Sequence, residues 1–227
     1  MSPTQSAPPR TVLLAGATGL VGRALLPLLL DHASVGLVHV LLRRAAPGIA
    51  EHPKLELHTV DLGHLKRLPH VDDVYIALGT TIKVAGSQAA FRMIDHDLVL
   101  AVARAAREAG AKRLAVVSAL GADRDSRIFY NRVKGDMEAD VAALGYESVC
   151  FAQPSMLTGD RAALGQRERP GEVWTLRLLR PLMPLLPKRI RPIAAHDVAA
   201  ALIAATMAGR PGVHHLSSAR MQGAHPH

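Results

Sequence analysis

The stretch TVLLAGATGLVG, residues 11–22, decides the fold. Thr11–Ala15 is a short apolar run typical of a buried strand, and it ends at the first of three glycines spaced G-x-x-G-x-x-G. Leu20–Asp31 then carries apolar residues densely enough for a buried helix. Strand, glycine loop and helix in this order predict a phosphate-binding turn, because glycines let the backbone approach a pyrophosphate at the positive end of the helix dipole. The residues expected to hold the pyrophosphate are Gly16, Thr18, Gly19, Leu20, Val21 and Gly22.

Outward from this turn, apolar runs of strand length alternate with longer helical segments. Such alternation predicts an α/β fold, a doubly wound parallel sheet of the Rossmann type with helices on both faces. We expect a single domain with a small C-terminal extension on the substrate side. Its parts are a disordered lead-in (1–10), the Rossmann domain (11–216, with substrate-side elements mainly in 155–196) and a flexible tail (217–227). The expected strands are 37–42, 55–60, 73–78, 113–117, 148–152, 190–193 and 213–216, and the expected helices are 88–109, 126–144, 172–179 and 196–207.

Composition disfavours several classes of protein. Of the 227 residues, 49% are apolar and 20% charged, which is ordinary for a soluble α/β domain, and no apolar run is long enough to span a bilayer. The net charge of +8 comes from dispersed basic residues with only 3% aromatic residues, so we expect no nucleic-acid partner. Residues 1–10 lack the apolar centre of a secretory signal, and the single cysteine, Cys150, lies in an apolar segment, which together favour a cytoplasmic protein. Because the adjacent His214 and His215 point to opposite faces of a strand, we expect no metal site.

The end of the second expected strand indicates which cofactor binds. NAD-binding proteins hold the ribose hydroxyls with an acidic residue about 20 residues after the glycine loop, whereas a 2′-phosphate requires arginine. Arg43 and Arg44 occupy that place, and no Asp or Glu occurs between Asp31 and Glu51. Because a guanidinium binds a phosphate through two hydrogen bonds, we expect NADP(H) in preference to NAD(H). The pair Asp61 and Leu62 after the third strand suits the adenine pocket, although Asp61 equally suits the cap of a following short helix.

Residues 130–134, YNRVK, carry the strongest chemical signal. Tyr130 and Lys134 are four residues apart on an expected helix, so they share a face, and the doubly wound strand order directs that face toward the nicotinamide. A phenol with a free pKa near ~10 is a poor acid-base catalyst at neutral pH, and an adjacent ammonium favours its ionised form. Lys134 also suits the nicotinamide ribose, while Ser118, at the end of the fifth strand, steadies the oxygen that Tyr130 protonates. In the alternative interpretation, Tyr130 is a core aromatic residue and Lys134 a surface charge.

These motifs, with VSALGAD at 117–123, resemble the atypical branch of the short-chain dehydrogenase/reductase superfamily. The stretches ALGTTIKVAGSQAAFRMIDHD, SRIFYNRVKGDME and RPIAAHDVA are most similar to the group of Tat-interactive-protein-like oxidoreductases. The resemblance covers roughly residues 11–215 and implies a Rossmann fold and a pyridine-nucleotide cofactor. The site residues that it implies are the triad Ser118, Tyr130 and Lys134, Pro154 and Ser155 beside the nicotinamide, and Gly79 and Thr80 along the adenosine.

Two residues depart from the family pattern. Asp95 stands where many relatives have an asparagine, and Gln153 stands where arginine is common, and both weaken the expectation of rapid turnover. Asp197 lies in a family-like stretch, but we expect it to be a helix N-cap rather than a catalytic group. The apolar segment Trp174–Pro187 is either the wall of a substrate pocket or the cover of the sheet, and its basic flanks also permit a membrane-surface contact.

The leading hypothesis from the sequence is an NADP(H)-dependent oxidoreductase acting on a small carbonyl or alcohol. In it Tyr130 is the acid-base group, Lys134 tunes Tyr130 and anchors the cofactor, and Ser118 orients the substrate. The first alternative is an NADP(H)-binding regulatory or redox-sensing protein with little turnover. The second, an NAD-dependent epimerase or dehydratase, is disfavoured by Arg43 and Arg44. The expected partner is a small-molecule substrate, without nucleic acid or integral membrane contact, bound to a monomer or homodimer.

Overall fold

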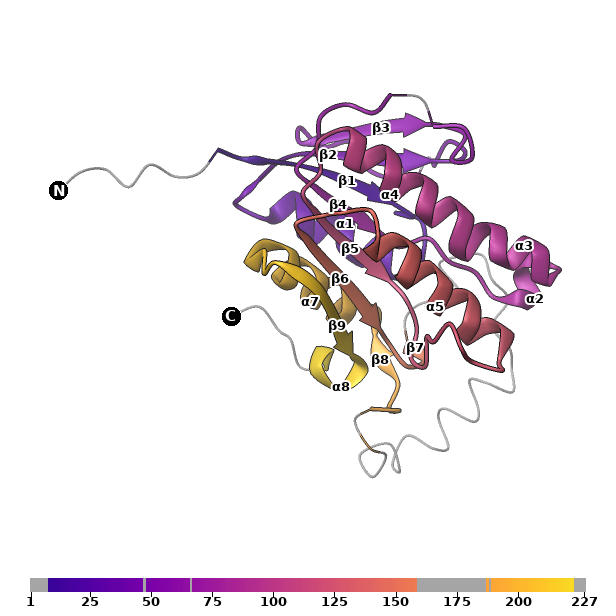
Figure 1. Ribbon diagram of the computed structural model, residues 1–227. Helices are drawn as coiled ribbons and strands as arrows, with labels where there is room; N and C mark the ends of the chain where they lie inside the picture. Colours follow the sequence, from indigo (N-terminus) through magenta and orange to yellow (C-terminus); the bar gives the residue numbers. More distant parts are fainter. Residues whose placement is uncertain (1–7, 47, 66, 159–186, 188, 223–227) are drawn as a thin grey trace.

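Seven parallel strands form the main sheet of the computed structural model, which describes residues 8–46, 48–65, 67–158, 187 and 189–222 (Figure 1). The strands are β1 (Arg10–Ala15), β2 (Val35–Leu42), β3 (Leu55–Thr59), β4 (Asp73–Ile76), β5 (Arg113–Val117), β6 (Ser148–Gln153) and β9 (Gly212–Ser217). Their order in the sheet is β3-β2-β1-β4-β5-β6-β9, and every neighbouring pair is parallel. The predicted fold class, a doubly wound parallel sheet of the Rossmann type, is confirmed.

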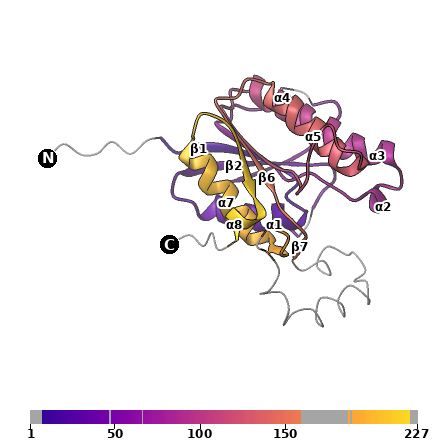
Figure 2. The same ribbon diagram turned by 60° about the horizontal axis from the view of Figure 1, so that its bottom comes forward.

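Helices cover both faces of this sheet (Figure 2). One face carries α1 (Leu20–Asp31) and α7 (Ala195–Ala208), and the other carries α4 (Leu98–Glu108) and α5 (Phe129–Ala142). Leu13 and Leu14 in β1 explain the two layers, because consecutive strand side chains point to opposite faces. Leu14 enters the core with α1 and α7, whereas Leu13 enters the core with α4 and α5. A strand that is buried on both faces must be apolar throughout, as the sequence pattern indicated.

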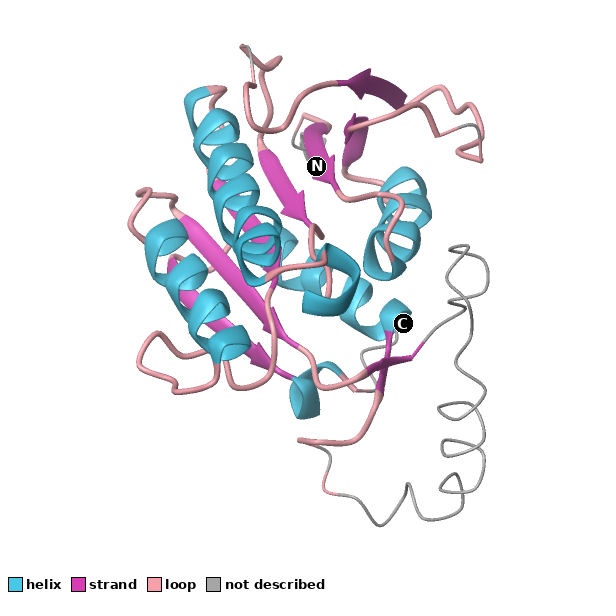
Figure 3. Cartoon of the chain, turned by 90° about the vertical axis from the view of Figure 1, so that its right-hand side faces the viewer, coloured by secondary structure: helices cyan, strands magenta, loops and turns pink. Residues whose placement is uncertain are grey.

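Smaller elements complete the described part of the chain. The short helices are α2 (Ile82–Ala85), α3 (Gln88–Arg92) and α8 (Ser218–Met221), and a π-helical turn, η1 (Met93–Asp97), joins α3 to α4. The two-residue strands β7 (Leu157–Thr158) and β8 (Ile193–Ala194) pair in parallel outside the main sheet (Figure 3).

The strand order reverses beside β1. β1 pairs with β2 on one side and with β4 on the other, so the chain leaves β1 toward α1 on one face and leaves β4 toward α3 and α4 on the opposite face. Such a switch point opens a crevice at the carboxyl ends of the strands, where doubly wound sheets bind their ligands. Gly16 follows β1 directly and Gly79 lies just beyond β4, so both belong to this crevice.

Two predicted helices differ from the structure. The helix expected over 88–109 is interrupted by η1, and ion pairs between this region and α5 accompany the interruption. Arg92 Nη1 donates to Asp136 Oδ2 at 2.8 Å, and His96 Nε2 lies 3.0 Å from Asp140 Oδ2. Because such contacts join residues far apart in the sequence, a local pattern cannot reveal them.

The second helix was expected to begin at residue 126 but begins at Phe129. Ser126 instead forms the preceding turn, since its Oγ accepts a hydrogen bond from Ile128 N at 3.2 Å. Asp197 was predicted to be a helix N-cap, and this prediction is wrong. Helix α7 starts at Ala195, so Asp197 lies within its first turn. There its carboxylate faces the positive end of the helix dipole instead of capping the helix.

The ends of the predicted domain are also revised. The prediction of a flexible tail from residue 217 is wrong for 217–221, because Ser217 ends β9 and 218–221 form α8, whose fully buried Met221 packs into the core beside α7. Arg10, assigned to the lead-in, begins β1, and its guanidinium forms an ion pair with the buried carboxylate of Asp73 in β4. Residues 1–7 and 223–227, the helix expected over 172–179 and most of the segment Trp174–Pro187 lie outside the described residues.

Candidate active site

Backbone crowding requires glycine at two positions of the loop after β1. Gly16 has φ of +93°, and a Cβ there would lie 2.5 Å from the carbonyl oxygen of Ala77, just after β4. A Cβ on Gly22 would lie 2.0 Å from the carbonyl oxygen of Gly16. Both distances are far below any van der Waals contact, and the opposing atoms are backbone. The loop therefore folds tightly against the end of β4, which brings the start of α1 into the crevice.

The N-terminus of α1 is open to an anion. Its N-cap is Gly19, which has no side chain to accept from the first amides, and the first turn contains no acidic residue. These amides point along the positive end of the helix dipole and have no partner within the helix. A pyrophosphate fits this arrangement, and the role of Gly16, Thr18, Gly19, Leu20, Val21 and Gly22 in binding it stays a prediction.

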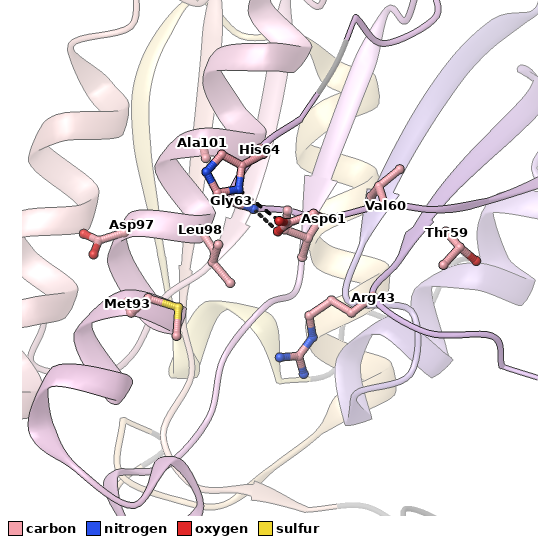
Figure 4. Close-up of a pocket in the computed structure, with 11 residues that line it drawn as sticks. Arg43, Thr59, Val60, Asp61, Gly63, His64, Met93, Asp97, Leu98 and Ala101 are labelled. Carbon is pink, nitrogen blue, oxygen red and sulfur yellow. Dashed lines mark hydrogen bonds and ion pairs between the residues drawn. The ribbon is translucent and has the colours of Figure 1, made fainter.

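A pocket of about 710 Å³ adjoins the carboxyl ends of β2 and β3 (Figure 4). Its walls come from the segments that follow these two strands and from η1 and α4. The lining residues are Arg43, Thr59, Val60, Asp61, Leu62, Gly63, His64, Met93, Asp97, Leu98 and Ala101. The structure thus brings together Arg43, Asp61 and Leu62, three of the residues predicted for the adenosine end of the cofactor. Arg44 is exposed and does not line the pocket.

The Arg43 side chain points into this pocket (Figure 4). It forms no hydrogen bond or ion pair with any residue that the structure describes. A guanidinium exposes five N–H donors in a planar fork, so an unpaired one at the edge of a pocket suits a phosphate.

Asp61 stabilises a turn instead of capping a helix. Its Oδ1 accepts from Gly63 N at 2.9 Å, and its Oδ2 lies 2.9 Å from His64 Nδ1. The hydrogen bond with His64, followed by that from Gly63, lowers the pKa of the Asp61 carboxyl. Leu62 is buried beside it. His64 was missed in the sequence, because only the turn brings it back to Asp61.

The triad residues lie at the carboxyl end of β5 and on α5, outside the pocket that contains Arg43. Ser118 follows β5, and its buried Oγ makes no hydrogen bond with any described residue. Its backbone N–H donates to the carbonyl oxygen of Ala152 at 2.7 Å, which fixes its position against β6. Tyr130 is half-buried, and its ring centroid lies 5.2 Å from that of Phe91. A buried hydroxyl without a partner is unfavourable, so Ser118 Oγ is suited to a ligand oxygen.

Asp95, which the sequence marked only as a departure from its family, forms a buried ion pair with Lys134. Lys134 Nζ lies 2.7 Å from Asp95 Oδ1, and both side chains are almost fully buried. Asp95 Oδ2 also accepts from Thr80 N at 2.8 Å. A Cβ built on Gly79 would lie 3.3 Å from Asp95 Oδ1, so this carboxylate packs closely against the chain beyond β4. The structure thus joins Gly79, Thr80 and Lys134 through Asp95.

This ion pair changes the expected electrostatics of Tyr130. Burial, and then the negative charge of Asp95, raise the pKa of Tyr130 to about 12. The sequence argument expected Lys134 to lower it, but the ammonium is paired with Asp95. Burial also raises the pKa of the Asp95 carboxyl, while Lys134 and then Thr80 oppose that rise. At neutral pH, Tyr130 is therefore a protonated phenol, able to donate a proton but a poor base.

Pro154 and Ser155 hold the loop after β6 in place. The carbonyl oxygen of Pro154 accepts from Leu120 N at 2.9 Å, which ties this loop to the one after Ser118. Ser155 Oγ donates to the carbonyl oxygen of Arg191 and lies 2.9 Å from Ser218 Oγ. The Ser155 side chain is therefore engaged with the C-terminal elements.

Gln153, the second departure from the family pattern, belongs to a separate network. Its Nε2 lies 3.1 Å from Glu138 Oε1, and His215 Nε2 lies 3.1 Å from Glu138 Oε2. Because Glu138 is on α5, the amide of Gln153 ties β6 to that helix.

Cys150 is buried and unpaired, as predicted, and burial raises the pKa of its thiol to about 12. A protonated buried thiol is a poor nucleophile, so Cys150 is a packing residue. No helix in the described part of the chain is both long and apolar enough to cross a membrane.

Comparison with known proteins identifies the family. The NAD(P)H-binding family model matches residues 16–147. The mitochondrial protein FMP52 of Eremothecium gossypii is 37% identical over 150 residues, which cover 66% of this chain and 67% of that protein. Mitochondrial fmp52 of Emericella nidulans is 35% identical over 169 residues, 71% of each chain.

Solved structures agree on the fold. MoeE5 in complex with UDP-glucose and NAD has a TM-score of 0.67 at 19% identity and covers 91% of this chain and 75% of its own. The ADP-L-glycero-D-manno-heptose-6-epimerase of Helicobacter pylori has a TM-score of 0.67 at 17% identity, with 92% and 77% covered.

The relatives correct one prediction. They are named mitochondrial, so the prediction of a cytoplasmic protein is wrong. The two features behind that prediction, a single cysteine in an apolar segment and the composition of residues 1–10, do not distinguish the cytoplasm from the mitochondrion. The family match and the relatives show that this chain belongs to the NAD(P)H-binding family and is related to FMP52, and the solved structures show that it shares their Rossmann fold.

Proposed function

We propose that this protein is an NADP(H)-dependent oxidoreductase of the short-chain type that reduces a small carbonyl compound. The proposal rests on the buried Ser118 Oγ, which has no hydrogen-bond partner among the described residues, and it is supported by a half-buried Tyr130 whose pKa is raised to about 12. A hydroxyl in need of a partner holds a substrate oxygen, and a phenol that stays protonated can give that oxygen a proton. The raised pKa favours reduction over oxidation, because oxidation requires the phenolate as base.

The residues that would hold NADP(H) extend from β1 to β3. The tight glycine loop and the open N-terminus of α1 fit the pyrophosphate, and Leu62 in the pocket fits the adenine. The uncommitted guanidinium of Arg43 fits the 2′-phosphate, with Arg44 exposed next to it. When bound, the nicotinamide supplies the hydride.

The Lys134 ammonium has two competing partners, the cofactor and Asp95. In the short-chain mechanism it holds the nicotinamide ribose, but here it pairs with Asp95 at 2.7 Å. Asp95 therefore competes with the cofactor for Lys134 and at the same time keeps the Tyr130 proton in place. This competition supports the alternative function, an NADP(H)-binding regulatory protein with slow turnover.

Substitution of Tyr130 tests the enzymatic function. Tyr130→Phe is expected to lower kcat for NADPH-dependent reduction of a panel of small aldehydes and ketones at least ~100-fold, because the proton donor is lost. NADPH affinity, measured by calorimetry, should stay within about twofold, since the hydroxyl does not hold the cofactor.

Tyr146→Phe is the matched control, because the Tyr146 hydroxyl donates to the carbonyl oxygen of Ala103 at 2.6 Å, within the core. It should retain full activity. Equal turnover by the Tyr130→Phe variant and the wild type would overturn the assigned role. NADPH binding without turnover on any substrate would favour the regulatory function, and tightly held NAD in the purified protein would favour an epimerase, the activity that two of the similar solved structures are named for.

A further inference from the structure

A cluster of two histidines and a glutamate lies at the edge of the sheet, away from every residue proposed to react. His39 belongs to β2, while Glu56 and His58 belong to the edge strand β3. In the parallel register, His39 pairs with Glu56, and Leu41 pairs with His58. Because residues two apart on a strand point to the same face, all three side chains project from one face of the sheet.

Three donor atoms converge in this cluster. His39 Nδ1 lies 2.9 Å from His58 Nε2 and 3.2 Å from Glu56 Oε2, and His58 Nε2 lies 3.8 Å from the same oxygen. A carboxylate only accepts hydrogen bonds, and two neutral imidazole nitrogens at this distance share one proton between them. A single hydrogen is therefore shared among three acceptor atoms, the two imidazole nitrogens and the carboxylate oxygen. A cation at their centre would bind all three.

The spacing of these atoms matches that around zinc. Zn²⁺ binds imidazole nitrogen and carboxylate oxygen at about 2.0 to 2.2 Å in a tetrahedron, which puts neighbouring ligand atoms roughly 3.3 to 3.5 Å apart. The three observed separations, 2.9, 3.2 and 3.8 Å, bracket that value. Among the described residues, this is the one group of three histidine, cysteine or acidic side chains with ligand atoms gathered so closely.

The cluster has one buried ligand residue and one exposed ligand residue, an arrangement that suits a metal ion with access to water. The His39 side chain is 5% exposed, whereas that of Glu56 is 55% exposed. The imidazole of His39 therefore fixes one ligand in the protein, while the carboxylate leaves the fourth position open to water. Two histidines and one glutamate form a ligand set that zinc uses with such an open position.

We propose that His39 Nδ1, His58 Nε2 and Glu56 Oε2 form a binding site for a divalent transition metal, zinc above all, which joins the edge strand β3 to β2. None of the three ligands lines the pocket that contains Arg43 or belongs to the triad. Its ligands come from two strands and follow no spacing motif, so the sequence alone predicted no metal site.

Zinc titration of the full chain, prepared without a histidine tag, tests this site. Competition with a chromogenic chelator should show one tight equivalent of Zn²⁺. The melting temperature should rise by about 5 to 10 °C at a free zinc concentration roughly 100 times Kd, because the ion binds only the folded chain. Co²⁺ in place of Zn²⁺ should give the intense visible absorption of a tetrahedral site.

Glu56→Gln and His58→Asn, both at accessible positions, should lose the tight equivalent, the thermal shift and the cobalt absorption. His64→Asn is the matched control, since His64 is an exposed histidine that also lies beside a carboxylate, that of Asp61. It should bind zinc like the wild type. A wild-type chain without a tight equivalent, or Glu56→Gln and His58→Asn variants with unchanged stoichiometry and thermal shift, would overturn the proposal.

Discussion

Arg43 is the residue on which the proposed cofactor preference depends. Arg43→Ala is expected to weaken NADPH binding about 10- to 100-fold, because a charged hydrogen-bonded pair contributes roughly 1.5 to 3 kcal/mol. NADH affinity should change little, since NADH lacks the 2′-phosphate. Calorimetric titration with both nucleotides measures the difference.

Arg44→Ala separates this contact from a general effect of charge. Arg44 is exposed and does not line the pocket, so its loss should reduce NADPH affinity less than the loss of Arg43. Equal effects of Arg43→Ala on NADPH and NADH would show that the guanidinium does not contact the 2′-phosphate.

Asp95 controls the proton of Tyr130 in the proposed mechanism. Its negative charge is one of two causes that raise the pKa of Tyr130. Asp95→Asn removes that charge and releases Lys134, so the pKa of the phenol should fall. Oxidation of an alcohol, which needs the phenolate, should then begin at lower pH than in the wild type, as a pH profile of kcat/KM would measure.

Asp140→Asn provides the control for this profile. Asp140 is a carboxylate on the same helix as Lys134, but it pairs with His96. Its substitution should leave the pH profile of kcat/KM the same as that of the wild type. A profile that does not move in the Asp95→Asn variant would mean that Asp95 acts only on the structure.

At the scale of elements, an ion pair fastens β1 to β4. The Asp73 carboxylate is fully buried, and the Arg10 guanidinium is its partner. Arg10→Ala leaves a buried carboxyl without this cation, and burial already raises the pKa of Asp73. Because Arg10 is partly exposed, the expected loss is about 2 to 3 kcal/mol, below the full cost of breaking a buried pair. Urea unfolding measures it.

A second substitution tests whether charge causes that loss. Asp73→Asn in the Arg10→Ala background should recover part of the stability, since an amide is less costly to bury than an unpaired carboxylate. A change in unfolding free energy below about 0.5 kcal/mol for Arg10→Ala would contradict this role of the pair.

The sequence predicted a helix or strand well where the pattern of neighbouring residues determines that element. The apolar runs at 37–42 and 113–117 become β2 and β5, because a strand buried on both faces must be apolar. The π-helical turn η1 was not predicted, since its Asp95 and His96, and Arg92 just before it, pair with α5, about 40 residues away along the chain. For the same reason the sequence identified Lys134 but not its partner.

At the scale of the whole molecule, α8 connects the end of the described chain to the predicted substrate side. Met221 is fully buried in the core beside α7, and the Ser218 hydroxyl meets that of Ser155. Met221→Ala should lower the unfolding free energy by about 2 to 4 kcal/mol, because it leaves a cavity in a packed core. Thermal or urea unfolding measures the loss.

Met156→Ala is the control for this substitution. The Met156 side chain is 57% exposed, so its truncation should change stability by no more than about 0.5 kcal/mol. A Met221→Ala variant as stable as Met156→Ala would indicate that α8 does not remain packed against the domain in solution.

The crowding around Gly16 and Gly22 also limits how this chain can evolve. The atoms that exclude a side chain there are backbone oxygens, so no second mutation can make room by shortening a neighbour. Arg43 lies at an exposed position, where replacement disturbs no packing. If Arg43 and this turn act as proposed, natural selection can therefore change the nucleotide preference at Arg43 far more easily than it can replace the glycines of the turn.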